Sequence, residues 1–370
     1  MLAALKTAIS NTGITYIVLL TNASAPGFTS PGTSFNTALT TAYLNTVSGD
    51  GATPPATTSR AYVVHSGGNT LSVVDTNVVD PTYNKVFARV AVGNDPYQVA
   101  VNSTANRVYV TNHGSNTVSV MDTTSNTIVA TVAVGASPWG VAVHPPANRA
   151  YVTNYGSNTV SVIDTISNTV IATVAVGNHP KGVAVDTLAN RVYITNFGTS
   201  STAGTVSVID TTNNTVVSTV VVGWGPNDVA VHPTANRAYV TNYYSENFSV
   251  IDTSNNTVVA TVTVGNTPTA VAAHPTANRV YITIANGGTV DSDVDTVKVV
   301  DTTSNTVVST VGVGWGPHGV AVNSTANRVY VTNTWDGTVS VIDTTSNTAV
   351  GEWWAYLWVA GGVMYGVAVF

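Results

Sequence analysis

The feature that most constrains the fold of this chain is an internal repeat. Six copies of a segment with the pattern Asn-Arg-Val/Ala-Tyr-Val/Ile-Thr-Asn/Ile begin at Asn106, Asn148, Asn190, Asn236, Asn278 and Asn327, and a degenerate first copy begins at Ser59. Three of the spacings are 42 residues, and the longer ones contain insertions. A period of this length is typical of architectures in which each copy is one supersecondary unit.

Each unit contains four short segments with the composition of β-strands. In the third unit they are Trp139–His144, Arg149–Asn154, Thr159–Asp164 and Thr169–Gly177. Val, Ile, Tyr and Thr are enriched in these segments, turn residues separate them, and no helical period is present. The turn between the third and fourth segments has the pattern Asp-Thr-x-Ser/Asn-Asn-Thr, in which we expect a left-handed conformation at Asn126, Asn168, Asn214, Asn256, Asn305 and Asn347. Four strands in every unit predict the blades of a β-propeller.

The count of segments predicts seven blades and a specific closure of the ring. Seven second strands begin at the repeated arginines, but the first-strand pattern occurs six times from Tyr97 onward and a seventh time at Tyr365–Val369. We therefore predict an all-β, seven-bladed propeller over residues 60–370, in which the C-terminal strand completes blade one. This assignment also accounts for the uncharged stretch Trp353–Phe370, which has nearly the length of a membrane helix, so we expect no membrane span.

Four of the repeats contain the string Tyr-Val-Thr-Asn, at Tyr109–Asn112, Tyr151–Asn154, Tyr239–Asn242 and Tyr330–Asn333. In strand order, spacing and motif, residues 60–370 resemble the YVTN β-propeller family. The resemblance implies a seven-bladed propeller displayed on an outer surface, as in archaeal surface-layer-type and bacterial extracellular proteins, and it implies no activity. Two copies depart from the motif, with Ile284 in place of Asn and with Val64-His65 in the first copy, so we expect local differences there.

Composition excludes several classes of function. The chain has a net charge of −6, and only 8% of its residues are charged. Nucleic-acid binding requires clustered cations, so we expect no nucleic-acid partner. The absence of cysteine excludes disulfides, thiolate metal sites and cysteine nucleophiles.

Nearly half of the charged residues, 14 of 30, recur at fixed positions in the repeat. An arginine begins each second strand and an aspartate ends each third strand, which places them side by side in an up-and-down blade. We expect these cross-strand pairs to be structural. The pairs are Arg107–Asp122, Arg149–Asp164, Arg191–Asp210, Arg237–Asp252, Arg279–Asp301 and Arg328–Asp343, with Arg60 and Asp75 in blade one.

One position differs between blades although the framework around it is nearly constant. It opens each innermost strand and is occupied by Tyr97, Trp139, Lys181, Asn227, Thr269, His318 and Tyr365, which we call the mouth ring. Concave sites such as the mouth of a propeller channel concentrate contacts, and aromatic side chains suit sugars or peptides. The divergence indicates an asymmetric ligand site, and the alternative interpretation is relaxed packing in a loop.

Metal and catalytic interpretations rest on few residues. His144, His232 and His274 share one repeat position and are expected to be turn residues, so no histidine metal site and no cofactor are predicted. The loop Ala285–Thr296 carries Asp291, Asp293 and Asp295, whose alternating carboxylates could ligate Ca²⁺ but could equally form a solvated acidic loop. A hydrolase similar to the lactonase propellers would depend on Asp95, His179, Lys181, Asp228 and His318.

Residues 1–59 contain no repeat and only two charged residues, Lys6 and Asp50. A short basic and apolar start followed by Ala23-Ser24-Ala25 has elements of a signal peptide, but the apolar stretch Gly13–Leu20 is short and we expect it to be retained. A segment of this size and composition could hardly bury enough surface to fold alone. We expect it to act as an assembly arm that contacts other protein subunits, in a homo-oligomer or a larger assembly.

The sequence thus predicts a non-enzymatic structural and recognition protein of an outer surface. The surface would be that of a cell envelope, an extracellular filament or a virus particle, with the propeller as the exposed head and residues 1–59 as its anchor. The first alternative is a secreted propeller that binds a glycan or peptide at the channel mouth. The second is a lactonase-like hydrolase.

Overall fold

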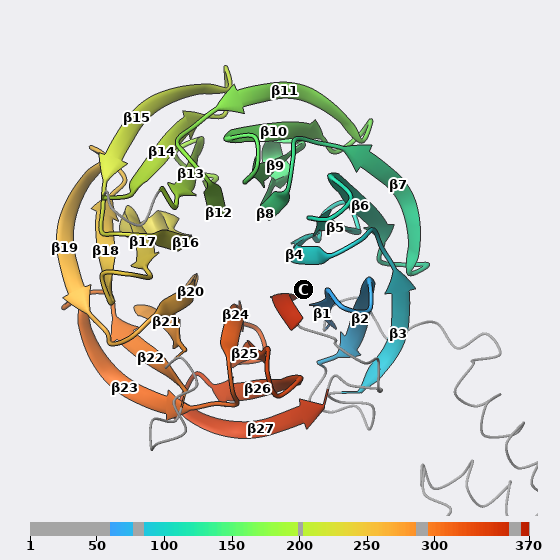
Figure 1. The fold of residues 1–370 in the computed structure, drawn as a ribbon. Coiled ribbons are helices and arrows are strands. Elements are labelled where there is room, and N and C mark those ends of the chain that lie inside the picture. Colours follow the sequence, from blue (N-terminus) through green and yellow to red (C-terminus); the bar gives the residue numbers. More distant parts are fainter. Residues whose placement is uncertain (1–59, 77–84, 199–202, 286–294, 355–363, 370) are drawn as a thin grey trace, which may run out of the picture. The chain divides into compact units, whose positions relative to one another are not determined.

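The computed structural model describes residues 60–76, 85–198, 203–285, 295–354 and 364–369. Within these ranges, 28 strands form seven four-stranded antiparallel sheets that are arranged as a ring of blades (Figure 1). The predicted fold class, a seven-bladed β-propeller, is therefore confirmed. Residues 1–59, which we predict to be an assembly arm, lie outside the described residues, and so the proposed boundary at residue 60 stays a prediction.

Each blade has the same strand order from the centre of the ring to its rim. The innermost strands are β28 (Met364–Val369), β4 (Pro96–Asn102), β8 (Pro138–His144), β12 (Pro180–Asp186), β16 (Pro226–His232), β20 (Pro268–Ala273) and β24 (Pro317–Asn323). The second strands are β1 (Arg60–His65), β5 (Arg107–Asn112), β9 (Arg149–Asn154), β13 (Arg191–Asn196), β17 (Arg237–Asn242), β21 (Arg279–Ile284) and β25 (Arg328–Asn333). The third strands are β2 (Thr70–Asp75), β6 (Thr117–Asp122), β10 (Thr159–Asp164), β14 (Thr205–Asp210), β18 (Asn247–Asp252), β22 (Thr296–Asp301) and β26 (Thr338–Asp343). The outermost strands are β3 (Val86–Ala91), β7 (Thr127–Ala133), β11 (Thr169–Ala175), β15 (Thr215–Val221), β19 (Thr257–Thr263), β23 (Thr306–Gly312) and β27 (Thr348–Trp354). Two single-turn 3-10 helices, η1 (Pro145–Ala147) and η2 (Pro233–Ala235), follow β8 and β16.

The ring closes as the sequence predicts. The C-terminal strand β28 pairs antiparallel with β1, with Val367 opposite Val63 and Ala368 opposite Tyr62. The C-terminal end accordingly lies beside β1 at the inner edge of blade one (Figure 1). Trp353–Phe370 thus begins in the outermost strand of blade seven and continues to the innermost strand of blade one, while residues 355–363 lie outside the described part. Among the residues that are described, no helix has the length and apolarity needed to cross a membrane.

The second and third strands carry the hydrophobic core, which lies between neighbouring blades. The tyrosine of the repeat motif is fully buried in every blade. Tyr193 of blade four, for example, shares a cluster with Val240 and Ile251 of blade five. Burial of such side chains contributes about 1.5–3 kcal/mol each. The apolar contacts that stabilise a blade are therefore in large part contacts with the next blade.

The threonine and asparagine of the motif form the polar joints of this framework. Thr153 Oγ1 accepts a hydrogen bond from the Gly140 N–H at 2.7 Å within its own blade and donates to the Lys181 carbonyl of the next blade at 2.6 Å. Asn154 Nδ2 donates to Thr159 Oγ1 and Ser161 Oγ at 3.0 and 2.9 Å. Thr153 thus joins blade three to blade four, and Asn154 joins the second strand of blade three to its third strand.

The two departures from the motif change these joints locally. In blade one, Val64 occupies the threonine position and is fully buried, so this position has no hydroxyl to reach blade two. His65 replaces the asparagine, and its Nε2 lies 2.8 Å from Ser72 Oγ, which retains the link to the third strand. In blade six, Ile284 is 2% exposed and joins an apolar cluster instead.

The repeated arginines and aspartates lie at hydrogen-bonding distance in six blades. Arg149 Nη1 is 2.8 Å from Asp164 Oδ2, and the equivalent contacts join Arg107–Asp122, Arg191–Asp210, Arg237–Asp252, Arg279–Asp301 and Arg328–Asp343. Asp164 Oδ1 also accepts the N–H groups of Ile166 and Ser167. These turn contacts, with Ser167 first, hold the pKa of Asp164 below its usual value. The turn asparagines Asn126, Asn168, Asn214, Asn256, Asn305 and Asn347 all have φ between 53° and 58°, the left-handed conformation expected for them.

Candidate functional site at the channel mouth

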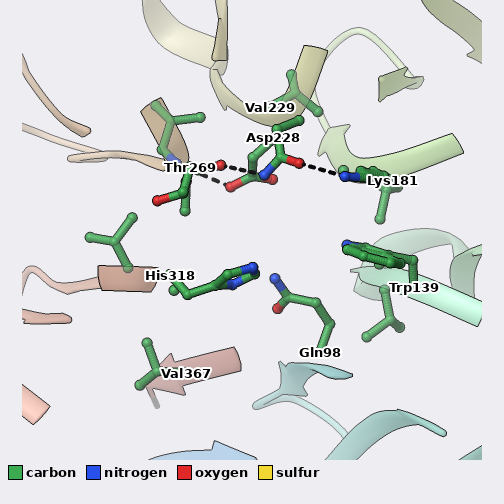
Figure 2. A pocket seen from close by; sticks show the side chains of 17 residues that line it. Gln98, Trp139, Lys181, Asp228, Val229, Thr269, His318 and Val367 are labelled. Atoms are coloured by element: carbon green, nitrogen blue, oxygen red, sulfur yellow. Dashed lines mark hydrogen bonds between the residues drawn. The ribbon is translucent and has the colours of Figure 1, made fainter. Parts of the chain in front are cut away.

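A cavity of about 170 Å³ lies where the innermost strands meet at the centre of the ring. Its polar lining consists of Gln98, Trp139, Lys181, Asn227, Asp228, Thr269 and His318, and valines from the innermost strands complete the wall (Figure 2). The volume is below the 300–1,000 Å³ or so of typical ligand pockets. The cavity therefore fits a small ligand, or one end of a larger ligand.

Glycines bring the innermost strands close together around this cavity. In several blades the residue after the mouth-ring position is glycine, and a Cβ atom at Gly140 or Gly319 would lie 2.4 Å from a carbonyl oxygen of the next blade. The equivalent position holds Gln98 in blade two and Asp228 in blade five, and both side chains line the cavity. The innermost strands thus approach closely where this position is glycine, and Gln98 and Asp228 add polar groups to the wall.

Three mouth-ring residues form a continuous aromatic shelf, composed of Tyr365, Tyr97 and Trp139 from blades one, two and three. The Tyr97 and Tyr365 rings stack with centroids 4.1 Å apart, and the Tyr97 and Trp139 centroids are 3.9 Å apart. The imidazole of His318 meets the edge of this shelf at 4.9 Å from Tyr365. Burial raises the pKa of Tyr97, so its hydroxyl remains protonated at physiological pH. The shelf is neutral and amphipathic, and Tyr97 at its centre is 9% exposed while Trp139 and Tyr365 are partly exposed.

Lys181 lies beside the shelf and spans the gap between two blades. Its Nζ atom is 3.6 Å from the ring centroid of Phe197 and 4.7 Å from that of Trp139, both within range of a cation–π contact. It also donates to Asn227 Oδ1 at 3.0 Å, and Asn227 Nδ2 donates to the Thr269 carbonyl at 2.7 Å. Burial lowers the pKa of Lys181 to about 8, which leaves the amine mostly protonated at neutral pH.

Two further ionisable groups face the cavity, and their pKa values are shifted in opposite directions. Burial raises the pKa of Asp228 to about 6, although its Oδ2 accepts the Val271 N–H at 3.0 Å. Burial, with a contribution from the nearby Lys181 charge, lowers the pKa of His318 to about 4, so this imidazole is neutral at physiological pH. Its ring and the Gln98 carboxamide point toward one another across the cavity (Figure 2). The cavity therefore offers one cation, one carboxylate and several neutral polar groups, of which His318 and Gln98 face each other.

The structure brings together the mouth ring but only part of the residue set expected for a hydrolase. Trp139, Lys181, Asn227, Thr269 and His318 line the cavity, and Tyr97 and Tyr365 contact them through their rings. Lys181, Asp228 and His318 share the cavity, whereas Asp95 and His179 do not line it. Asp95 lies 3.2 Å from His113 Nδ1, and His179 stacks on Tyr155. Gln98 and Phe197 were not predicted as site residues. The sequence signal for Gln98 was its position in the repeat. The residue after the mouth ring is glycine in four blades, whereas blades two and five have Gln98 and Asp228 there.

The predicted calcium loop falls mostly outside the described residues. Asp291 and Asp293 belong to that undescribed part, and Asp295 is buried with its Oδ2 accepting the Gly316 N–H at 2.7 Å. Within the described ranges, no group of three His, Asp or Glu side chains is arranged to hold a metal ion. His144 and His274 lie at turns, where their Nδ1 atoms accept backbone N–H groups at 3.3 and 3.0 Å.

Comparison with known proteins identifies the family and supports the fold. The model of the YNCE-like beta-propeller family matches residues 62–279. A functionally unknown protein from Desulfotomaculum acetoxidans has a TM-score of 0.69 at 19% identity, over 84% of this chain and 99% of that one. Kuenenia stuttgartiensis hydrazine synthase has a TM-score of 0.62 at 20% identity, over 68% of this chain and 78% of that one. No curated protein matches this sequence. At such identities the structural likeness extends to the fold alone.

Proposed function

The chain belongs to the YNCE-like beta-propeller family, and on that premise we propose that it is a non-enzymatic recognition and structural protein of an outer surface. The propeller is the exposed head, and its channel mouth binds one end of a glycan or peptide. The surface is that of a cell envelope, an extracellular filament or a virus particle.

The observation that carries this proposal is the contrast between the mouth ring and the strands that hold it. The repeated tyrosine is buried in all seven blades, and the repeated arginine pairs with the equivalent aspartate in six of them. The mouth ring, in contrast, has six different residue types in its seven positions, and five of its residues line one cavity. Packing alone would favour one residue type at equivalent positions of a repeat. A ring of unlike groups suits the recognition of an asymmetric ligand.

The chemistry of the cavity favours a ligand with both polar and apolar parts. The partly exposed rings of Trp139 and Tyr365 offer apolar surface, Lys181 offers a positive charge, and the His318 and Gln98 side chains offer neutral polar atoms at the centre. A sugar ring or a peptide end with a carboxylate combines these features. The pKa of His318, lowered to about 4, makes its imidazole a weak general base at physiological pH, which supports binding over acid–base chemistry at this residue.

Arrays of neutral glycans, acidic glycans and short peptides, probed with the labelled full chain, test this proposal. We expect the wild type to bind a restricted set of array positions, and the double variant Lys181→Met with His318→Gln to lose the positions that are bound at the channel mouth. Lys298→Met is the matched control, because Lys298 Nζ contacts Thr310 in blade six, away from the cavity. A wild type that binds neither glycans nor peptides, or a double variant that binds as well as the wild type, would contradict recognition at the mouth. Turnover of lactone or ester substrates that Asp228→Asn abolishes would contradict the non-enzymatic part.

The role of residues 1–59 as an assembly arm rests on sequence alone and is part of the same proposal. Light scattering after size-exclusion chromatography compares the solution mass of the full chain with that of residues 60–370, and circular dichroism checks that the shorter chain folds. A defined oligomer formed by the full chain only supports the arm. Two monomers, or two identical oligomers, contradict it.

A further inference from the structure

Two pairs of exposed aromatic side chains lie on the channel-mouth face, outside the cavity. In blade five, Trp224 and Tyr244 are 48% and 49% exposed, and in blade seven, Trp315 and Trp335 are 52% and 57% exposed. Within each pair, one residue comes from the loop before the innermost strand and the other from the loop between the second and third strands. We call them the blade-five pad and the blade-seven pad. Exposed aromatic side chains on this scale mark interaction surfaces more often than scattered aliphatic ones.

Each pad has the same backbone support. The Tyr244 N–H donates to the Trp224 carbonyl at 3.1 Å, and the Trp335 N–H donates to the Trp315 carbonyl at the same distance. The two tryptophans that precede the innermost strands are held in addition by side chains of the opposite loop. The Trp224 N–H donates to Ser245 Oγ at 2.7 Å, and the Trp315 N–H donates to Asp336 Oδ2 at 2.5 Å. The pads are therefore positioned by hydrogen bonds.

The pads have room because the larger and the smaller of two facing loop residues change places between blades. In blades two, three and four, the first loop has a side chain where the facing loop has glycine, in the combinations Asp95 with Gly114, Ser137 with Gly156, and His179 with Gly198. In blades five and seven the exchange is reversed, and Gly225 and Gly316 face Tyr244 and Trp335. Both glycines have φ above +60°, and a Cβ at Gly225 would lie 2.6 Å from the Tyr244 ring. The aromatic ring thus packs on a glycine backbone on one side and remains accessible on the other.

Charge narrows the class of ligand that the pads could bind. The charged residues in the loops that form the pads are the carboxylates Glu246 and Asp336. Carboxylates repel nucleic acids and anionic lipids, and binding of single-stranded nucleic acid by aromatic stacking needs a positive groove. Carboxylates accept hydrogen bonds from hydroxyl groups and serine can accept or donate them, while flat aromatic faces pack on the apolar face of a sugar ring.

We propose that the two pads bind a neutral glycan chain, with sugar rings stacked on Trp224, Tyr244, Trp315 and Trp335. The blade-five pad continues to the channel mouth, because Tyr244 contacts Phe197 with centroids 5.5 Å apart and Phe197 in turn covers the amine of Lys181. The pads thus form a second surface on the face that bears the mouth ring. This inference goes beyond the proposed function and does not depend on ligand binding inside the cavity.

Isothermal titration of the full chain with neutral hexasaccharides of glucose, mannose and N-acetylglucosamine tests the inference. We expect at least one of these sugars to bind the wild type, and Trp335→Ala and Trp224→Ala each to weaken its affinity by about tenfold or more. Ile166→Ala is the matched control, because Ile166 is 75% exposed in a turn between a third and a fourth strand, at the other end of its blade. Its affinity should equal that of the wild type.

Other outcomes separate this inference from the proposed function. Hexasaccharide binding that Lys181→Met abolishes and both tryptophan variants retain would place the sugar in the cavity, overturning the pads while sustaining recognition at the mouth. Wild-type protein that binds none of the hexasaccharides at millimolar concentration, or that binds a peptide through the tryptophans instead, would overturn the pads as a glycan surface.

Discussion

The strands that form the blades and the ring of residues at the channel mouth follow different rules in the same molecule. In most blades the repeated tyrosine, threonine and asparagine contact the same partners, such as the next blade's carbonyl for Thr153 and the third-strand hydroxyls for Asn154. At the mouth, equivalent positions have different contacts: Lys181 contacts Phe197 and Asn227, whereas Tyr97 contacts Tyr365 and Trp139. The strands are repeated because each position has the same packing requirement. The mouth is not constrained in this way, so its residues can serve recognition.

The largest expected difference between the two regions concerns truncation of an aromatic residue. Tyr193→Ala removes a fully buried ring that packs between blades four and five, so we expect a loss of about 3–5 kcal/mol in the free energy of unfolding. Trp139→Ala truncates a larger side chain that is only partly buried and should cost less. Urea unfolding of both variants measures the contrast. Equal losses would show that the mouth ring is as structural as the blades.

The next-largest expected effect is the pH dependence of stability, which differs between the two titratable groups in the cavity. The pKa of Asp228 is raised to about 6, so its contribution to stability is present below pH 4 and is lost as the pH rises through 6. The pKa of His318 is lowered to about 4, so its contribution is present above pH 6.5 and is lost as the pH falls through 4. In the wild type the two trends oppose each other over the same interval.

Single variants should expose each trend. We expect Asp228→Asn to stabilise the protein by about 2 kcal/mol at pH 7.5 and to have little effect at pH 4. His318→Gln should have its largest stabilising effect at pH 4 relative to pH 7.5. Thermal unfolding between pH 4 and 8 measures both profiles. Parallel profiles for the two variants would mean that these groups are not desolvated in the folded protein.

A smaller effect is expected at the joint between blades. Thr153→Val keeps the shape of the side chain but removes the hydroxyl that links Gly140 to Lys181, so we expect a loss of about 1 kcal/mol. Val64 shows that valine fits this position in blade one. Chemical denaturation with a shallow series of urea concentrations resolves a change of this size. No loss would mean that the joint contributes little to stability.

The smallest effect should come from the Arg–Asp pairs. Arg149→Ala removes a partly exposed ion pair and should cost about 0.2–1 kcal/mol. Asp164→Ala should cost more, because the same carboxylate also accepts two backbone N–H groups in its turn. The free energies of unfolding of both variants, measured in 0.15 M and 1 M salt, show which substitution costs more. A larger loss for Arg149→Ala would make the ion pair the main interaction of Asp164.

Most of the fold was predictable from the sequence because each blade repeats the same local signals. The Tyr365–Val369 pattern predicted the closing strand, and Asn168 predicted a left-handed turn residue. The role of Gln98 and the contact of Lys181 with Phe197 were not predicted, because they depend on how far neighbouring blades are apart at the centre. The turn contacts of Asp164 follow from the sequence as well, because an aspartate that precedes a left-handed asparagine in such a turn can accept backbone N–H groups.

The most direct test of the account is to exchange the mouth ring while keeping the blades. A full chain with Lys181→Thr, Asn227→Thr and His318→Thr retains every repeated tyrosine, asparagine and arginine, and blade six already has Thr269 at this position. Its thermal unfolding and its binding to the glycan and peptide arrays are measured together with those of the wild type. The account predicts cooperative unfolding within a few degrees of the wild type and loss of those array positions whose binding does not depend on Trp224 and Trp335. A protein that no longer folds cooperatively, or that binds the same array positions, would contradict the division between blades that hold the fold and a mouth that recognises the ligand.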